Sequence, residues 1–72
     1  MNSFGERLKI LRKERNFSQR QFAEVIGLTE RAYRNYEINK STPNFHVLIS
    51  LADFYDVSLD YLVGRSDNPE RR

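Results

Sequence analysis

The apolar pattern of residues 18–37 predicts two short helices joined by a tight turn. Ser18 is a suitable N-cap for the first helix, because its side-chain oxygen can accept a bond from an unpaired backbone N–H. Gly27 follows the last apolar position, where helices commonly end in a left-handed residue. The apolar face of this helix consists of Phe22, Ala23 and Ile26.

The second helix of this pair is predicted to begin at Thr29. Glu30 suits its first turn, because an acidic side chain there meets the positive end of the helix dipole. Its inward face consists of Tyr33, Tyr36 and Glu37. Its outer face carries side chains that can reach base edges, namely Glu30, Arg31, Arg34 and Asn35. The layout predicts a helix-turn-helix, and our hypothesis is sequence-specific binding to duplex DNA.

A further helix is expected on the N-terminal side, from a cap at Ser3 to about Arg15. Glu6 lies three positions after Ser3, the spacing of a capping box. The buried stripe of this helix consists of Phe4, Leu8 and Leu11. Phe17, in the short connection to the helix-turn-helix, is expected to reach the core.

Two more helices are expected on the C-terminal side, after a left-handed cap at Asn39. Thr42 or Pro43 would begin the fourth helix. Its broad apolar face predicts that this helix is the centre of the core; the face consists of Phe45, Leu48, Ile49, Leu51, Ala52 and Tyr55. A short fifth helix would run from a cap at Ser58 to a stop at Gly64.

Five short helices without a strand pattern predict an all-α fold, a compact five-helix domain. We assign residues 1–64 to the DNA-binding domain, with the helix-turn-helix at residues 18–37. Residues 65–72 form a polar tail that contains a proline, and we expect this tail to fray.

Composition restricts the function classes that remain. A chain of 72 residues has room for one small domain. Without cysteine it can form no disulfide or cysteine-based zinc site, and the single histidine, His46, is read as an exposed helix residue. No cofactor, metal or small-molecule ligand is expected, and no membrane span or signal peptide is visible. We therefore expect a cytoplasmic protein. The lack of a convergent nucleophile, base or metal set argues against an enzyme.

The net charge of +2 is unevenly distributed. Residues 1–36 carry eight basic and four acidic side chains, whereas residues 37–72 carry four basic and six acidic ones. A basic front and an acidic back would orient the molecule toward phosphate. The alternative is a solvated surface of mixed charge, and charge alone leaves both open.

The combined elements closely resemble the lambda-repressor-like, or XRE-type, DNA-binding domain of phage repressors, Cro proteins and bacterial regulators. The matching stretches are RLKILRKERNFSQRQFAEVIG, LTERAYRNYE, and the block from Pro43 to VSLDYLVG, which together cover about residues 4–64. This family is not usually catalytic, so the resemblance also implies a binding protein from a bacterium or a phage.

The resemblance assigns roles by position. Arg12 and Glu37 match a structural ion pair between the first and third helices, and we prefer this to a catalytic pair. Ala23 and Gly27 match small residues at a close helix approach. The positions that usually face bases hold Thr29, Glu30, Arg31 and Asn35. The positions of phosphate contacts hold Gln19, Lys40 and Ser41.

Two positions depart from the family pattern. Asn39 stands where glycine is usual, and a left-handed cap accommodates it. Glu30 stands where a neutral polar residue often reads bases. It either accepts a bond from cytosine N4 or remains an acid at the helix start, and we favour the second interpretation.

The implied mechanism places the third helix, at about residues 29–38, in the major groove. Arg31 would pair with guanine O6 and N7, Asn35 would read adenine, and Arg34 would reach a base or a phosphate. Arg20 joins the phosphate contacts, and for it a solvated surface role is a close alternative. Tyr33 and Tyr36 could stack on bases, but their inward spacing favours core packing.

One recognition helix reads few base pairs, so we expect a homodimer on two half-sites of a double-stranded DNA operator. The family often pairs through its last helix, which makes candidates of Phe54, Leu59, Tyr61 and Val63. The alternative is that Leu59 belongs to the monomer core and Tyr61 is merely half-exposed. The main interpretation is a transcriptional regulator, more often a repressor. An antitoxin or another protein-interaction module with the same fold is the competing class, and the polar outer face of the third helix disfavours it.

Overall fold

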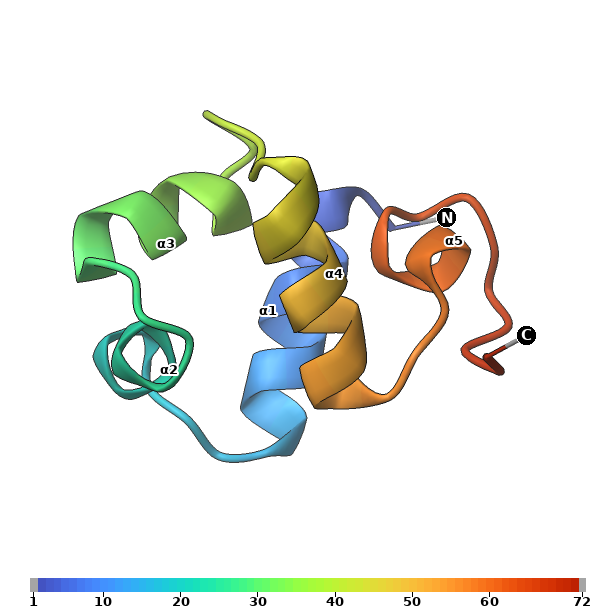
Figure 1. The fold of residues 1–72 in the computed structure, drawn as a ribbon, viewed down its shortest axis with the longest axis horizontal. Helices are drawn as coiled ribbons and strands as arrows, with labels where there is room; N and C mark the ends of the chain where they lie inside the picture. Colours follow the sequence, from blue (N-terminus) through green and yellow to red (C-terminus); the bar gives the residue numbers. More distant parts are fainter. Residues whose placement is uncertain (1, 72) are drawn as a thin grey trace.

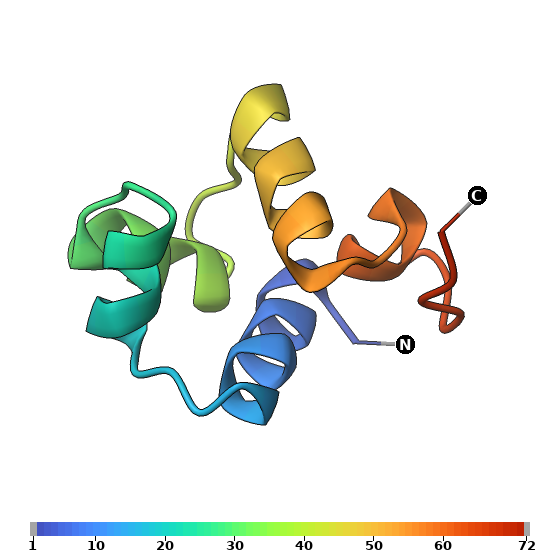
Figure 2. The same ribbon diagram turned by 60° about the horizontal axis from the view of Figure 1, so that its bottom comes forward.

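The computed structural model describes residues 2–71, and within them the chain forms five helices and no strand. Their bounds are Phe4–Glu14 (α1), Gln19–Val25 (α2), Glu30–Glu37 (α3), Phe45–Tyr55 (α4) and Leu59–Leu62 (α5). Helices α2 and α3 form one end of the molecule, α1 and α4 the middle, and α5 with the C-terminal segment the other end (Figures 1 and 2). The all-α, five-helix prediction is confirmed. None of these helices is both long enough and apolar enough to cross a membrane.

Each helix begins at a polar side chain that accepts a hydrogen bond from the backbone N–H three residues later. The five N-caps are Ser3, Ser18, Thr29, Asn44 and Ser58. At Ser3 and Ser18 the third residue of the helix bonds back to the cap, which completes two capping boxes. Local sequence therefore sets where the helices start.

The predicted start of the fourth helix was wrong. The helix begins after Asn44, whose side-chain oxygen accepts a bond of 2.9 Å from Val47 N, and not at Thr42 or Pro43. The ring of Pro43 disfavours a helical conformation at Thr42, and asparagine is among the best N-caps. The loop between α3 and α4 consequently extends from residue 38 to residue 44.

The core is shared by all five helices. The largest fully buried side chains come one from each helix, and they are Leu8, Phe22, Tyr33, Leu51 and Leu62. Among the described residues, helix α4 contributes three of the ten buried core side chains, more than any other helix, so the prediction that it is central to the core holds for part of its length. Leu51, Ala52 and Tyr55 are buried, but Phe45, in the first turn of α4, is 68% exposed. A broad apolar face on a helix need not be covered along its whole length.

Phe22 is the centre of an aromatic cluster inside the protein. Its ring lies 5.2 Å from the rings of Tyr33 and Tyr55, and 5.3 Å from that of Phe54. Phe17, from the connection before α2, lies 5.6 Å from Phe22, as expected for a core residue. Such pairs stabilise a core beyond the area they bury, and this cluster joins α2 to both α3 and α4.

The C-terminal segment is held against the globule, so the expectation that the tail frays was wrong for residues 65–71. Ser58 N donates to Pro69 O at 3.0 Å. Asp67 pairs with Arg7 at 3.1 Å, and Arg7 is 4% exposed. The Arg7 guanidinium lies 3.9 Å from the centre of the Tyr61 ring. Arg72 and Met1, at the outer ends of the predicted tail and domain, lie outside the described residues.

Candidate nucleic-acid interface

The turn between α2 and α3 has the geometry of a helix-turn-helix. Gly27 has a φ of +77°, as predicted for the end of the first helix. Leu28 N then donates to Ala23 O at 2.8 Å, which folds the chain back on α2. Ala23 is buried where α2 and α3 approach each other, and Tyr33 is buried on the inner side of α3. This packing fixes which side of α3 faces outward.

The predicted base-reading residues all reach solvent. Thr29, Arg31 and Arg34 are exposed, and Glu30 and Asn35 are partly exposed. No ion pair among residues 2–71 involves Arg31. The guanidinium of Arg31 therefore needs no rearrangement within its own chain before it can meet an acceptor. Base reading by these five residues remains a prediction.

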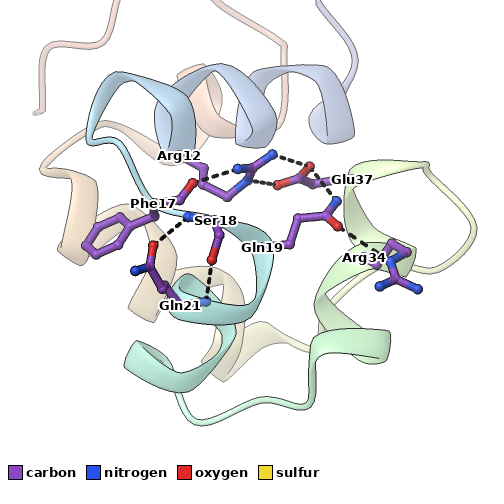
Figure 3. A network of polar contacts seen from close by, with 7 residues as sticks. All are labelled: Arg12, Phe17, Ser18, Gln19, Gln21, Arg34 and Glu37. Carbon is purple, nitrogen blue, oxygen red and sulfur yellow. Dashed lines mark hydrogen bonds and ion pairs between the residues drawn. The ribbon is translucent and has the colours of Figure 1, made fainter.

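Glu30 is paired with Arg34 one turn later on the same helix. The distance from Arg34 Nη2 to Glu30 Oε2 is 2.9 Å. Arg34 Nε also donates to Gln19 Oε1 on α2, at 3.5 Å (Figure 3). An acid in the first turn that pairs at i+4 stabilises its own helix. This geometry supports the interpretation of Glu30 as a helix-start acid that also orients Arg34.

The predicted phosphate contacts differ in how freely they can move. Gln19 is tied inward, because its Nε2 donates to Glu37 Oε1 at 3.1 Å (Figure 3). Arg20 is exposed and lies 3.6 Å from Glu24. Lys40 and Ser41 both donate from the backbone to the carbonyl of Asn35, at 2.9 and 3.3 Å, while their side chains are exposed. The loop thus closes over the end of α3 and leaves both side chains outside. Contact with phosphate remains a prediction for all four.

The predicted ion pair between α1 and α3 is present. Arg12 Nε donates to Glu37 Oε2 at 2.6 Å and Nη2 donates to Oε1 at 3.2 Å. Its Nη1 donates to the carbonyl of Phe17 at 2.7 Å (Figure 3). Arg12 and Glu37 are both buried. One guanidinium therefore holds α1, the connection before α2, and α3 together.

The surroundings of Glu37 keep it ionised. Burial alone would raise the pKa of this carboxyl, but hydrogen bonds from Arg12 and Gln19 and the charge of Arg12 together lower it below its ordinary value of 4.5. Burial raises the pKa of neighbouring Tyr33 well above its ordinary value, so this ring stays neutral. The Tyr33 hydroxyl has no hydrogen-bond partner of good geometry among the described residues. The pair is thus a structural clamp under the outer face of α3.

An attachment between α1 and the residue just beyond the end of α3 was not predicted. Asn39 has a φ of +60°, which confirms its left-handed cap, and its side-chain oxygen accepts a bond from Gly5 N at 3.0 Å. A Cβ atom at Gly5 would overlap the carbonyl oxygen of Glu37. These residues are far apart in the sequence, so no local pattern indicates the contact. By contrast, the second capping box was readable from the spacing of Ser18 and Gln21.

The candidate dimer residues occupy different surroundings. Phe54 packs against Phe17 and Phe22 inside the aromatic cluster. Tyr61 lies against the guanidinium of Arg7 and is partly buried. Leu59 is 41% exposed, so the alternative that it belongs to the monomer core was wrong, and Val63 is partly buried. A dimer contact through α5 remains a prediction, in which Leu59 has the most accessible surface.

Known proteins are similar to this chain in sequence. A family model described as helix-turn-helix matches residues 8–62. An uncharacterised HTH-type transcriptional regulator of Bacillus subtilis, YobD, is 40% identical over 67 residues, which are 93% of this chain and 60% of that protein. The transcriptional repressor RstR of the cryptic phage CTXphi in Vibrio cholerae is 38% identical over 60 residues, 83% of this chain and 54% of that protein. The chain therefore spans between half and two thirds of the length of these relatives.

The fold is also similar to a solved repressor structure. The P22 c2 repressor in complex with a synthetic operator has a TM-score of 0.82 at 26% identity, with 92% of this chain and 100% of that chain covered. The family match, which runs from within α1 to the end of α5, shows that this chain belongs to the lambda-repressor-like, or XRE-type, helix-turn-helix family.

Proposed function

We propose that this chain is a sequence-specific DNA-binding transcriptional regulator, and more specifically a repressor that reads the major groove with α3. The observation that carries this proposal is the outward side of α3. It presents two arginines and an amide from a helix whose opposite side is fixed by a buried ion pair. A rigid helix with such side chains fits the recognition of base edges. The similarity of this chain to two repressors, RstR and the P22 c2 repressor, supports the repressor assignment.

In the proposed mechanism, phosphate contacts position the domain and base contacts select the site. Gln19, Arg20, Lys40 and Ser41 would meet the backbone on either side of the groove. Arg31 would donate two bonds to a guanine and Asn35 would pair with an adenine. Arg34, held by Glu30, would meet a flanking base or phosphate. Occupation of a promoter by the domain would then block transcription.

A homodimer is part of the proposal. Two copies related by a twofold axis would place two α3 helices in successive major grooves, about 34 Å apart. Leu59 and Val63 on α5 are the proposed contact residues. Because such a regulator meets its operator where the genome lies, we propose the cytoplasm as its location.

The test is DNA binding by the purified chain. Duplexes would be selected from a random pool by the wild-type chain, and binding to the selected duplex would be measured by fluorescence anisotropy over a range of salt concentrations. Replacement of Arg31 and Arg34 by alanine should abolish the preference for the selected duplex over a random one. The matched control replaces Lys13 and Arg65 by alanine. Both residues are exposed and lie outside the helix-turn-helix, so the control loses the same amount of positive charge.

The two double variants separate base reading from general electrostatics. The control should keep the sequence preference and lose only some of the salt-dependent affinity. Undiminished binding by the Arg31→Ala/Arg34→Ala variant would refute the proposed reading face. Selection of no preferred duplex by the wild-type chain would refute sequence-specific DNA binding and leave a protein-interaction role.

A further inference from the structure

The start of the loop that follows α3 is attached to the N-terminal end of α1 by one side chain. Asn39 Oδ1 accepts a bond of 3.0 Å from Gly5 N, and Asn39 Nδ2 donates to Ser3 Oγ at 3.1 Å. Both groups of the amide are therefore used, and both partners belong to the start of α1. The residues joined by these bonds are 34 and 36 positions apart in the sequence.

The bond to Gly5 satisfies a backbone group that α1 cannot satisfy itself. The first amides of any α-helix have no partner within the helix. Ser3 Oγ already accepts a bond from Glu6 N at 3.2 Å, so the local cap serves one of these donors. Asn39 serves another from a different part of the chain, and in doing so completes the N-terminal cap of α1.

Asparagine combines two properties at this position. The φ of +60° is one that asparagine tolerates better than most other side chains. Glycine would adopt it with less strain, but glycine has no side chain to reach α1. Replacement of Asn39 by glycine therefore separates the two properties. It keeps the left-handed backbone conformation and removes the side-chain bonds to α1.

The attachment lies directly beside the proposed DNA face. Lys40 and Ser41 follow Asn39, and their amides close over the carbonyl of Asn35 at the end of α3. On the inner side, the absence of a Cβ at Gly5 lets α1 approach the carbonyl of Glu37. Movement of Asn39 relative to α1 would therefore shift both the end of α3 and the loop that follows it.

We propose that Asn39 is a positioning residue for DNA binding, which fixes the end of α3 and the Lys40–Ser41 loop on the N-terminus of α1. The inference rests on the proposed DNA-binding function and deepens it. The buried pair of Arg12 and Glu37 holds α3 from the inside, and Asn39 holds its exposed end. Two attachments restrict the tilt of a helix more than one does. A preorganised helix binds with less loss of conformational freedom.

The experiment compares Asn39→Gly with a control that loses a side-chain cap elsewhere. Ser58→Ala removes the N-cap of α5, because Ser58 Oγ accepts a bond from Tyr61 N at 3.0 Å. Helix α5 lies at the end of the molecule opposite α2 and α3 (Figure 1). Urea unfolding would measure the stability of each 72-residue variant. Anisotropy would measure binding to a duplex selected by the wild-type chain, at a temperature where unfolding curves show every variant folded. Hydrogen exchange would report the Gly5 amide.

Asn39→Gly should expose the Gly5 amide to exchange and weaken binding to the selected duplex by about five- to tenfold, the equivalent of about one lost hydrogen bond. Its affinity should also depend less steeply on salt, because the loop is no longer held at the phosphates. Ser58→Ala should reduce stability to a comparable extent. Because Ser58 caps the helix of the proposed dimer contact, the oligomeric state of this variant would be compared with wild type by analytical ultracentrifugation, and at the same oligomeric state its affinity should change by less than about twofold.

The outcomes separate this inference from the proposed function. Equal DNA binding by wild type and Asn39→Gly, with reduced stability, would show that Asn39 only stabilises the fold and would overturn the inference. Failure of Asn39→Gly to fold would overturn it as well. If the wild-type chain binds no duplex, the proposed function fails first, and that result is visible before any variant is compared.

Discussion

Arg12 and Glu37 form a two-point ion pair inside the protein, with 2.6 Å between Arg12 Nε and Glu37 Oε2. They lie 25 residues apart, on α1 and α3. The same carboxylate accepts a bond from Gln19 on α2. Three helices thus meet at one buried negative charge. The outward side of α3 owes its orientation to a polar contact beneath it.

Removal of one partner of this pair should be strongly destabilising. Glu37→Ala leaves the Arg12 guanidinium buried without its counter-charge, and we expect the free energy of unfolding to fall by about 3–5 kcal/mol. Urea unfolding at neutral pH measures this change. Glu24→Ala is the matched control, because Glu24 belongs to an exposed ion pair, and it should change stability by less than about 1 kcal/mol. Similar losses in the two variants would show that the buried pair has no special role.

The same carboxylate should make stability depend on acid pH. Its pKa lies below the ordinary 4.5 in the folded protein, so the unfolded chain takes up the proton first as pH falls. The stabilisation from Glu37 is complete at neutral pH and is lost as the pH falls below about 4.5. Thermal unfolding at neutral pH and at about pH 3 measures this loss of stability. The apolar double variant Arg12→Met/Glu37→Leu should lose less stability on acidification than the wild type. An equal loss would assign the acid sensitivity to other carboxylates.

Release of Arg34 from Glu30 should strengthen DNA binding. Glu30→Gln removes a negative charge from the proposed DNA face and the partner of Arg34. We expect higher affinity at low salt and a steeper salt dependence, with stability lower by about 0.3–1 kcal/mol because the helix loses its first-turn acid. Titration of a selected duplex at several salt concentrations measures the first effect. Glu70→Gln, in the C-terminal segment, is the charge-matched control.

This substitution also decides between the two interpretations of Glu30. An acid that only supports the helix start leaves the selected DNA sequence unchanged when it becomes glutamine. An acid that accepts a bond from cytosine would give a different preferred base at one position. Selection from a random pool with both proteins makes the comparison, and a changed base would contradict the interpretation we favour.

The C-terminal segment should detach when its carboxylate is removed. Asp67→Ala takes away the partner of the buried Arg7, and we expect stability to fall by about 1–2 kcal/mol. Trypsin should then cleave after Arg65 faster than in the wild type, because the docked segment no longer protects it. Asp60→Ala, which removes the exposed and longer pair with Arg65, should have little effect on stability. Unchanged cleavage in Asp67→Ala would show that other contacts hold the segment.

Several features of the fold were predictable because their causes are local. The caps at Ser3, Ser18, Thr29 and Ser58 act on amides three residues away, and the left-handed residues Gly27 and Asn39 follow from backbone sterics. Helical spacing alone placed Phe22 and Tyr33 inside. The start of α4 was misplaced because two adjacent helix-start signals, Pro43 and Asn44, compete, and the stronger cap prevailed.

The features of the candidate site also divide into those that local sequence predicts and those that depend on how the helices pack. The residues on the outward side of α3 follow from its inward ones, since a helix has only one face to bury. The pairing of Arg12 with Glu37 was inferred from family resemblance. The partners of Arg34 required the relative placement of α2 and α3, and the reach of Asn39 to α1 required the positions of both chain segments.

The sequence by itself determined the five helices, the turn that joins α2 to α3, and the polar face that α3 presents to solvent. All of these depend on interactions within a few residues. Only the tertiary structure decided that Asp67 of the C-terminal segment pairs with Arg7, that Phe45 stays exposed, and that Asn39 completes the cap of α1. Those outcomes depend on which surfaces meet when the helices pack, and the helical periodicity of a sequence does not specify contacts between helices.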